Sequence, residues 1–213
     1  MKTYDLTHPL TSGMPVYPGT EPPRFAPIAD ILADHYREVA FSMTSHVGTH
    51  IDAPAHVMAE GRTLDAFPPD AFFGRALVVD CRHLAPGMPI TEACLAPYGA
   101  AAKEADFLLF SVGWEESWGT PADFEGYPCP DAALLDLIAA RGYRGIGIDA
   151  ISIDPVGSVA GHRRLFAGCE MLLLENLRGL APLLGCRVGL VCLPLALTGA
   201  DGAPARIVAR LDE

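Results

Sequence analysis

The chain has 213 residues, and half of them are hydrophobic, which is ample for one buried core, so that we expect a single domain over residues 1–213. Its 15 Lys and Arg residues against 26 Asp and Glu residues give a formal net charge of -11, with no basic run. This balance excludes nucleic acid and anionic membranes as expected partners.

The first predicted element is a turn in the segment PVYPGT, residues 15–20. Pro18 followed by Gly19 favours a type II turn, because proline presets the first turn position and glycine accepts the positive φ of the second. The turn places Tyr17 beside a stiff loop. Its ring then either packs at the turn or forms an aromatic wall for a ligand.

Residues 41–52, FSMTSHVGTHID, form the first predicted strand, and a group of ligand-type residues begins within it. Four such side chains occupy even-numbered positions, so that in an extended chain they project from one side: His46, His50, Asp52 and His56. A single histidine is more often a cap or a core hydrogen-bonding residue. Four ligand-type residues at one parity instead favour Zn²⁺ or another borderline divalent cation such as Mn²⁺.

A straight strand could not bring this group to one ion. It would separate the first histidine from the last by roughly 33 Å, at about 3.3 Å per residue. Only His50 and Asp52, about 7 Å apart on adjacent positions of one face, reach a shared ion without help. We therefore expect bends at Gly48, which can take a bulge or a positive φ, and at Pro54, which ends strand pairing.

The later predicted strands are short apolar runs rich in Val, Ile, Leu and Phe. They cover residues 75–81, 106–113, 144–153, 171–177, 187–197 and 205–211. One predicted helix, residues 130–142, begins at an N-cap Asp131 and stops at Gly142, and a second covers residues 91–105. The strand, helix, strand order around residues 131–153 indicates a βαβ-type unit, so we expect the α/β class with a mixed sheet.

Two further candidate ligands lie in the second half of the chain. Glu175 follows four apolar residues, where a carboxylate is costly unless it is paired or ligates a cation. A solvent-facing strand end, or a pair with Arg178, is its alternative role. His162, in AGHRRLF, is either a ligand or a residue at the start of a helix. Other residues could orient ligands or act as caps and turn residues: Asp149, Ser152 and Asp154.

The remaining polar and thiol residues carry weaker signals. Three histidines stand alone in loop-like segments, and we expect them at the surface: His8, His35 and His83. The six cysteines include no C-x-x-C pair, which is typical of free thiols. The first ten residues lack an apolar export region, and no apolar tract is long enough to span a bilayer, so we expect a cytoplasmic protein without a disulfide framework.

The stretch HVGTHIDAPAH resembles the H-x-G-T-H-x-D-x-P-x-H motif of the metal-dependent cyclase family, which includes bacterial kynurenine formamidases and isatin hydrolases. The likeness extends nearly end to end, through PVYPG, GIDAISIDP, the ENL element and LPLALTGADGAPAR. It implies a swivelling β/β/α-type fold, a homodimer or higher oligomer, and a small-molecule substrate.

The resemblance also implies roles for the candidate residues. Positions matching His46, His50 and Asp52 hold one zinc ion in the formamidases, and a second is held by those matching Asp52, His162 and Glu175. The position of His56 is the proton donor and acceptor. Isatin hydrolases use a single manganese ion. The implied cofactor is therefore a divalent metal, one or two Zn²⁺ ions or Mn²⁺.

The activity implied is hydrolysis of an amide bond in a small substrate, with an arylformamidase acting on N-formylkynurenine as the first expectation. A cyclic-amide hydrolase of the isatin type or a lactone hydrolase is the nearest alternative. A cyclisation or dehydration catalyst, or a metal-binding protein without hydrolytic activity, represents a different class. A structural zinc site has four protein ligands and no use for an unligated base such as His56, which argues against the non-catalytic alternative.

Two positions depart from the family pattern. The formamidases usually carry Trp where this chain has Tyr17, the candidate substrate-binding residue, so this departure bears on the substrate. The spacing of thirteen residues from His162 to Glu175 is one longer than usual. We therefore expect a bulge between Ala167 and Leu174 that takes up the additional residue.

Overall fold

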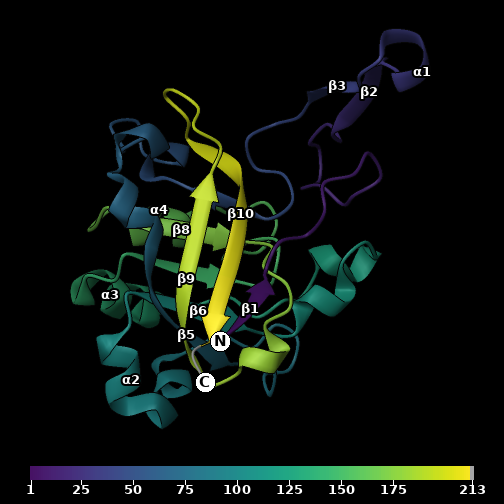
Figure 1. Ribbon diagram of the computed structural model, residues 1–213. Coiled ribbons are helices and arrows are strands. Elements are labelled where there is room, and N and C mark those ends of the chain that lie inside the picture. Colours follow the sequence, from purple (N-terminus) through teal and green to yellow (C-terminus); the bar gives the residue numbers. More distant parts are fainter. Residues whose placement is uncertain (212–213) are drawn as a thin grey trace.

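A computed structural model gives the structure of residues 1–211, and the last two positions of the predicted domain, 212 and 213, lie outside the described residues (Figure 1). The strands are β1 (Lys2–Asp5), β2 (Arg24–Ala29), β3 (Glu38–Ser42), β4 (His50–Asp52), β5 (Phe73–Asp80), β6 (Phe107–Ser111), β7 (Gly145–Ile148), β8 (Leu172–Glu175), β9 (Arg187–Pro194) and β10 (Gly202–Leu211). The α-helices are α1 (Ile31–Asp34), α2 (Gly99–Glu104), α3 (Ala132–Arg141) and α4 (Ala160–Phe166). None of the described helices combines the length and the apolar character that crossing a lipid bilayer requires.

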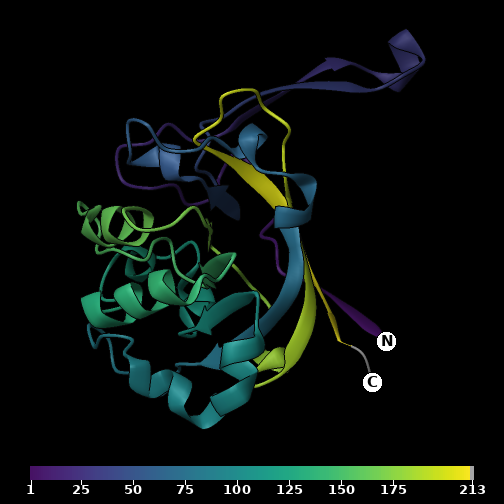
Figure 2. The ribbon, with the colours of Figure 1, turned by 90° about the vertical axis from the view of Figure 1, so that its left-hand side faces the viewer.

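Eight strands form one mixed sheet in the order β1-β10-β4-β8-β7-β6-β5-β9. Strands β5 to β8 pair in parallel, whereas β4, β9 and β10 pair with their neighbours in antiparallel fashion. Because β10 also pairs with β9, the sheet closes on itself. Figures 1 and 2 show helices α2, α3 and α4 gathered on one side of it. The predicted α/β class with a mixed sheet is confirmed.

The parallel strands are buried on both faces, which explains why they read as continuous apolar runs. Along β5, Leu77 and Val79 face the core cluster beneath the helices, whereas Ala76 and Val78 face a second cluster enclosed by the curved sheet. Helix α3 packs Leu134, Leu135 and Ile138 into the first cluster. Strand β8 packs against both clusters, through Leu173 on one face and Leu172 and Leu174 on the other, whereas β4 places Ile51 in the second cluster.

Helix α3 begins and ends where the sequence predicts. The Asp131 side chain accepts a hydrogen bond from Leu134 N at 2.7 Å, and Gly142 adopts a positive φ of 71° at the C-terminus. The helix connects β6 to the neighbouring parallel strand β7. The predicted βαβ-type unit is therefore confirmed.

Two predicted elements are wrong as continuous units. Residues 41–52 do not form one strand, because β3 ends at Ser42 and β4 begins only at His50. The predicted helix over residues 91–105 is a 3-10 segment, Glu92–Tyr98, followed by α2. Pro97 explains the second break, since proline lacks an N–H and clashes with the preceding turn of an α-helix.

The other differences lie mainly at element ends and in elements without a sequence signal. The predicted strand over residues 144–153 is shorter, because β7 stops at Ile148 and a bent segment follows. Strands β1 and β2 and helix α4 were not predicted. The expected bulge between Ala167 and Leu174 is absent, since β8 pairs with β4 and β7 in unbroken register. Residues 167–171 connect α4 to β8 and belong to neither element.

Strands β2 and β3 form a hairpin that projects from the body of the molecule and carries α1 at its tip (Figures 1 and 2). We refer to residues 24–42 as the arm. Every residue of β3 is exposed. Several large apolar side chains of the arm face solvent: Ile28, Ile31, Leu32, Tyr36, Val39 and Phe41.

Candidate metal centre

Three candidate ligands come from two neighbouring strands. His50 and Asp52 lie on one face of β4, as the alternation of side chains along a strand requires. Strand β4 pairs with β8 so that His50 stands directly opposite Glu175. This register brings together residues that are distant in the sequence.

The ligand atoms of this group are close and almost fully buried. His50 Nε2 lies 3.2 Å from Asp52 Oδ1 and 3.5 Å from Glu175 Oε2. The three side chains are at most 5% exposed. One ligand atom from each lies within 4.8 Å of the others, which is compact enough for one metal ion.

The loop before β4 fixes the orientation of His50. Gly48 has a φ of 61°, and a Cβ atom there would lie 2.8 Å from Leu10 Cδ2, so the predicted bend occurs at a position that favours glycine. The Gly48 carbonyl accepts a hydrogen bond from His50 Nδ1 at 2.8 Å. Because a carbonyl can only accept, Nδ1 carries the proton and Nε2 faces Asp52 and Glu175.

His162 reaches the same carboxylates from helix α4. Its Nε2 lies 3.3 Å from Asp52 Oδ2 and 3.4 Å from Glu175 Oε1. Its Nδ1 donates to Asp154 Oδ2 at 2.8 Å. Asp154 also accepts from the main-chain N–H groups of Gly161 and His162, so one side chain satisfies the start of α4 and orients the imidazole.

The charges of this group explain the protonation of His162. Burial alone lowers the pKa of His162, but Asp154, Asp52 and Glu175 outweigh burial and raise it to about 12. Burial likewise raises the pKa of Asp52, yet His50 and His46 beside it hold it well below its usual range. The proton on His162 therefore balances buried carboxylates that a divalent cation would also neutralise, and metal binding requires its release.

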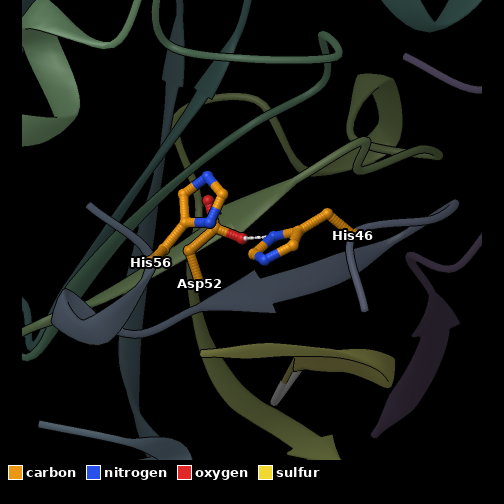
Figure 3. Close-up of side chains that lie close together, drawn as sticks. All are labelled: His46, Asp52 and His56. Carbon is orange, nitrogen blue, oxygen red and sulfur yellow. Dashed lines mark hydrogen bonds and ion pairs between the residues drawn. The ribbon is translucent and has the colours of Figure 1, made fainter. Parts of the chain in front are cut away.

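His46 lies beside Asp52 with its ring directed at the Asp52 carboxylate (Figure 3). It donates from Nδ1 to Asp52 Oδ1 at 2.7 Å, and its Nε2 contacts Asp201 Oδ2 at 2.9 Å. Burial lowers the pKa of His46, but Asp52 and Asp201 reverse this effect and raise it to about 9. Ligand atoms of His46, Asp52 and His56 also lie within 4.8 Å of one another. These residues form a second group whose donor types suit a metal ion.

His56 lies at the end of the 3-10 turn Pro54–His56, which begins where Pro54 was expected to end the strand. Its ring centroid is 3.9 Å from that of His46 and 5.7 Å from that of His162. Burial lowers the pKa of His56, and the neighbouring histidines add to this effect against the opposing carboxylates. His56 is therefore neutral at pH 7 and able to accept a proton.

The donor set fits a divalent cation. Imidazole nitrogens and carboxylate oxygens are the ligands that Zn²⁺ and Mn²⁺ take in proteins. The histidines at 50 and 162 each donate Nδ1 to a fixed acceptor and turn Nε2 toward the two buried carboxylates. This arrangement is typical of metal-ligating histidines. The Glu175 side chain does not face solvent or pair with Arg178, because it contacts His50 and His162 and accepts from Ile153 N at 2.9 Å.

A cavity of about 330 Å³ opens onto these residues and contains Tyr17, Ile151 and Val159 in its wall. Thr20 N donates to Tyr17 O at 2.9 Å and Gly19 has a φ of 90°, as in the predicted type II turn. The Tyr17 hydroxyl accepts a hydrogen bond from Gly157 N at 2.6 Å. The phenol is thereby fixed at the cavity wall.

The structure corrects the expectation for His8, places Asp149 outside the centre and adds Asp201 to the residues around it. His8 is not at the surface: it is 6% exposed and stacks on Trp118 with ring centroids 3.8 Å apart. His35 and His83 are exposed, as predicted. Asp149 is buried away from the centre, where it accepts from the main-chain N–H groups of Val112 and Gly113. Asp201 was missed as a candidate, and its only signal was its place in the GADGAPAR stretch of the family likeness.

Solved structures resemble this chain over nearly its whole length. Isatin hydrolase A from Labrenzia aggregata, bound to benzyl benzoate, gives a TM-score of 0.85 at 24% identity, with 100% of this chain and 94% of that chain covered. Isatin hydrolase A from Ralstonia solanacearum gives a TM-score of 0.84 at 25% identity, with 98% of this chain and 91% of that chain covered. A predicted metal-dependent hydrolase from Bacillus stearothermophilus gives a TM-score of 0.75 at 30% identity, with 98% of this chain and 97% of that chain covered.

The family model named Cyclase matches residues 4–155, which is more than half of the chain. The matched region contains the motif with His46, His50, Asp52 and His56. Together with the mixed α/β fold shared with the solved structures, this match confirms the resemblance seen in the sequence. The chain belongs to the cyclase family.

Proposed function

We propose that this protein is a metal-dependent hydrolase that cleaves an amide bond in a small aromatic substrate. One observation carries the proposal: His50 and His162 present Nε2 to two buried carboxylates, and His56 stands beside them at the cavity. An arylformamide of the N-formylkynurenine type is the first candidate substrate. Similarity to two isatin hydrolases supports a cyclic amide as the second candidate.

The residues proposed to hold the metal are His46, His50, Asp52, His162 and Glu175, and Zn²⁺ or Mn²⁺ is the proposed cation. When bound, such a cation acts as a Lewis acid that polarises a carbonyl group and lowers the pKa of water. The two carboxylates keep a buried negative charge that retains the cation. The partners of Nδ1 on His50 and His162 keep these imidazoles in the orientation that ligation requires.

His56 is the proposed general base and acid. It is neutral and 28% exposed in its side chain, so it can take a proton from water at the cavity and return it to the leaving nitrogen. It is not part of the buried group of His50, Asp52 and Glu175, although its ligand atom lies within 4.8 Å of those of His46 and Asp52. Its assignment as a base that does not bind the metal is the part of the proposal that favours a catalytic over a structural site.

The cavity sets the size of the substrate. A volume of about 330 Å³ lies at the lower end of the range for small-molecule sites. Apolar wall residues such as Ile151 and Val159 suit an aromatic ring, and Tyr17 adds an aromatic side chain. We therefore expect substrates with one or two rings.

Metal dependence is the first test. Protein treated with a chelator and then dialysed should lose hydrolysis of both an arylformamide and isatin, and Zn²⁺ or Mn²⁺ should restore it. The bound metal is identified and counted by mass spectrometry. Full activity in a metal-free sample would contradict the mechanism, and a panel in which only lactones are cleaved would replace the amide assignment.

His56→Ala separates chemistry from metal binding. General acid–base groups contribute about 10²- to 10⁴-fold in rate, so kcat should fall by that factor while metal content stays near that of the parent. His83→Ala is the matched control, because His83 is exposed and away from the cavity. A metal-depleted His56→Ala protein would make His56 a ligand, and an unchanged kcat would exclude it as the base.

A further inference from the structure

We propose that Asp201 is a positioning residue that orients His46 and His56 through one shared carboxylate. The part of this inference that concerns catalysis rests on the proposed function. The part that concerns metal affinity rests on the proposed metal ligands and does not depend on any hydrolytic activity. Asp201 is outside both compact ligand groups of the described residues.

The main chain of Asp201 is tied to the segment that carries His56. Ala53 N donates to Asp201 O at 2.9 Å, and Ala53 directly precedes the 3-10 turn Pro54–His56. The neighbouring Gly202 pairs with Asp52 in the register of β10 and β4. The position of Asp201 relative to the candidate centre is therefore fixed by strand pairing.

The side chain of Asp201 reaches both histidines. Its Oδ2 lies 2.9 Å from His46 Nε2 and 3.5 Å from His56 Nδ1. The two imidazole rings are 3.9 Å apart at their centroids and tilted by 40°, so one oxygen can serve both. At 44% exposure the Asp201 carboxylate stands at the rim, whereas Asp52 is 1% exposed.

Gly202 keeps the His46 ring at this carboxylate. A Cβ atom at position 202 would lie 2.4 Å from His46 Cε1 and 2.9 Å from its Nδ1, so only glycine leaves room for the ring against strand β10. The ring is thus confined between the main chain at Gly202 and the imidazole of His56. Asp201 supplies the polar contact that sets its rotation.

The contact between Asp201 and His46 gives each of the three histidines proposed as ligands an acceptor outside the centre. His50 has the Gly48 carbonyl as an acceptor outside the centre, and His162 has Asp154. The corresponding acceptor for His46 is Asp201, which leaves Nδ1 facing Asp52. Such outer acceptors hold ligating imidazoles in place, and their loss typically lowers metal affinity by about 10- to 100-fold.

For His56 the same carboxylate selects the tautomer. An acceptor near Nδ1 favours the proton on that nitrogen and leaves Nε2 as the basic atom. Nε2 is then the nitrogen available to take a proton during hydrolysis. An aspartate that orients a histidine in this way contributes to rate without contacting the substrate.

The role of Asp201 in metal affinity is tested without any substrate. The zinc affinity of Asp201→Asn is measured by competition with a chromogenic chelator. We expect a loss of about 10- to 100-fold with an unchanged number of ions at saturating zinc. Asp5→Asn is the matched control, because Asp5 is 37% exposed and its ion pair with Arg206 also involves β10. An affinity within twofold of the parent would overturn the proposal, and a lost ion at saturation would make Asp201 a ligand instead.

The role of Asp201 at His56 is tested on zinc-saturated protein. In ¹⁵N-labelled Asp201→Ala the His56 tautomer should shift from Nδ1–H toward Nε2–H, and kcat should fall at least about 10-fold with KM within about twofold, as for a loss of acid–base positioning. An unchanged tautomer excludes the role at His56. If the parent hydrolyses none of the candidate substrates, the proposed function fails, while zinc affinity and the tautomer still decide the role of Asp201.

Discussion

His50 and Glu175 stand directly opposite each other on antiparallel strands β4 and β8, with Nε2 and Oε2 3.5 Å apart. This pairing makes the candidate centre a property of strand register. A slip of one residue would turn His50 and Asp52 to the other face of the sheet and away from Glu175. The two buried cores against β8, and the burial of Ile51 of β4 in the second of them, stabilise the observed register.

Glu175→Gln should lower metal content, because it keeps the shape of the side chain but removes one of two buried negative charges. We expect the loss of at least one bound ion, or a drop of about 10-fold or more in zinc affinity, measured after dialysis by mass spectrometry. Glu170→Gln is the control, since Glu170 is 55% exposed and pairs with Arg62 at the surface. Equal metal content in parent and Glu175→Gln would remove Glu175 from the ligand set.

Asp154→Asn should weaken metal binding by a different route. Asparagine keeps one of the two oxygens that accept from the main-chain N–H groups of Gly161 and His162, so α4 loses at most one of these hydrogen bonds. The carboxylate that holds His162 Nδ1 is lost, however, and zinc affinity should fall by about 10- to 100-fold. Titration with a competing chelator measures this loss.

Asp131→Asn provides the matched control for this variant, because it makes the same substitution at the N-cap of α3, away from the centre. It should leave zinc affinity unchanged. If both variants weaken binding equally, general destabilisation of the helices explains the effect. If neither does, the orientation of His162 does not depend on Asp154.

The part of the site that the sequence predicts is local. His50 and Asp52 share a face because strand side chains alternate, and Gly48 and Pro54 mark bends because their backbone preferences are strong. His162 needed the family resemblance to stand out from an ordinary helix-start residue. Its approach to the carboxylates depends on how α4 packs, which no local pattern records.

The strand over residues 41–52 shows why the remaining features escaped prediction. Its residues have the composition of a strand throughout, yet β3 pairs with β2 in the arm and β4 pairs in the main sheet. Composition does not specify the pairing partner. The same limit hid Asp201, whose contacts depend on the pairing of β10 with β4, and the burial of His8 against Trp118.

Gly202→Ala should displace His46. The added Cβ would lie 2.4 Å from His46 Cε1, a distance that requires the ring or the strand to move. We expect zinc affinity to fall by about 10-fold or more, as for loss of an orienting contact. Gly189→Ala is the control within a neighbouring strand, because its Cβ would meet Arg210 O at an ordinary 3.8 Å. Unchanged affinity in Gly202→Ala would show that His46 is not held against β10.

We propose that a second copy of the chain covers the arm, in keeping with the expected homo-oligomer. An isolated two-stranded hairpin is marginally stable in water, and Leu32 and Phe41 on this one are 88% and 59% exposed. The protein should sediment as a dimer or larger at micromolar concentration. Leu32→Asp with Phe41→Asp should shift it to monomer, whereas Met88→Asp, at another exposed apolar position, should not. A monomeric parent would contradict the proposal.

His8 makes the stability of the protein sensitive to acid. Burial, with Arg178 nearby, lowers the pKa of His8 from 6.5 to about 4. As pH falls below 6.5, the unfolded chain therefore binds a proton at this position before the folded protein does, and the free energy of unfolding declines until pH reaches about 4. The decline from this residue between pH 7 and pH 4.5 is about 2 kcal/mol, at about 1.4 kcal/mol per pKa unit.

His8→Phe tests this dependence, because phenylalanine keeps an aromatic ring against Trp118 but cannot titrate. Urea unfolding at pH 7 and pH 4.5 should show a smaller loss of stability in this variant than in the parent, by about 2 kcal/mol. His83→Phe, at an exposed position, should lose as much stability as the parent. Since the candidate metal centre also contains histidines, both pH values are measured with chelator present, so that metal release does not contribute to the difference. Identical losses in the parent and His8→Phe would show that His8 is protonated equally in the folded and unfolded states.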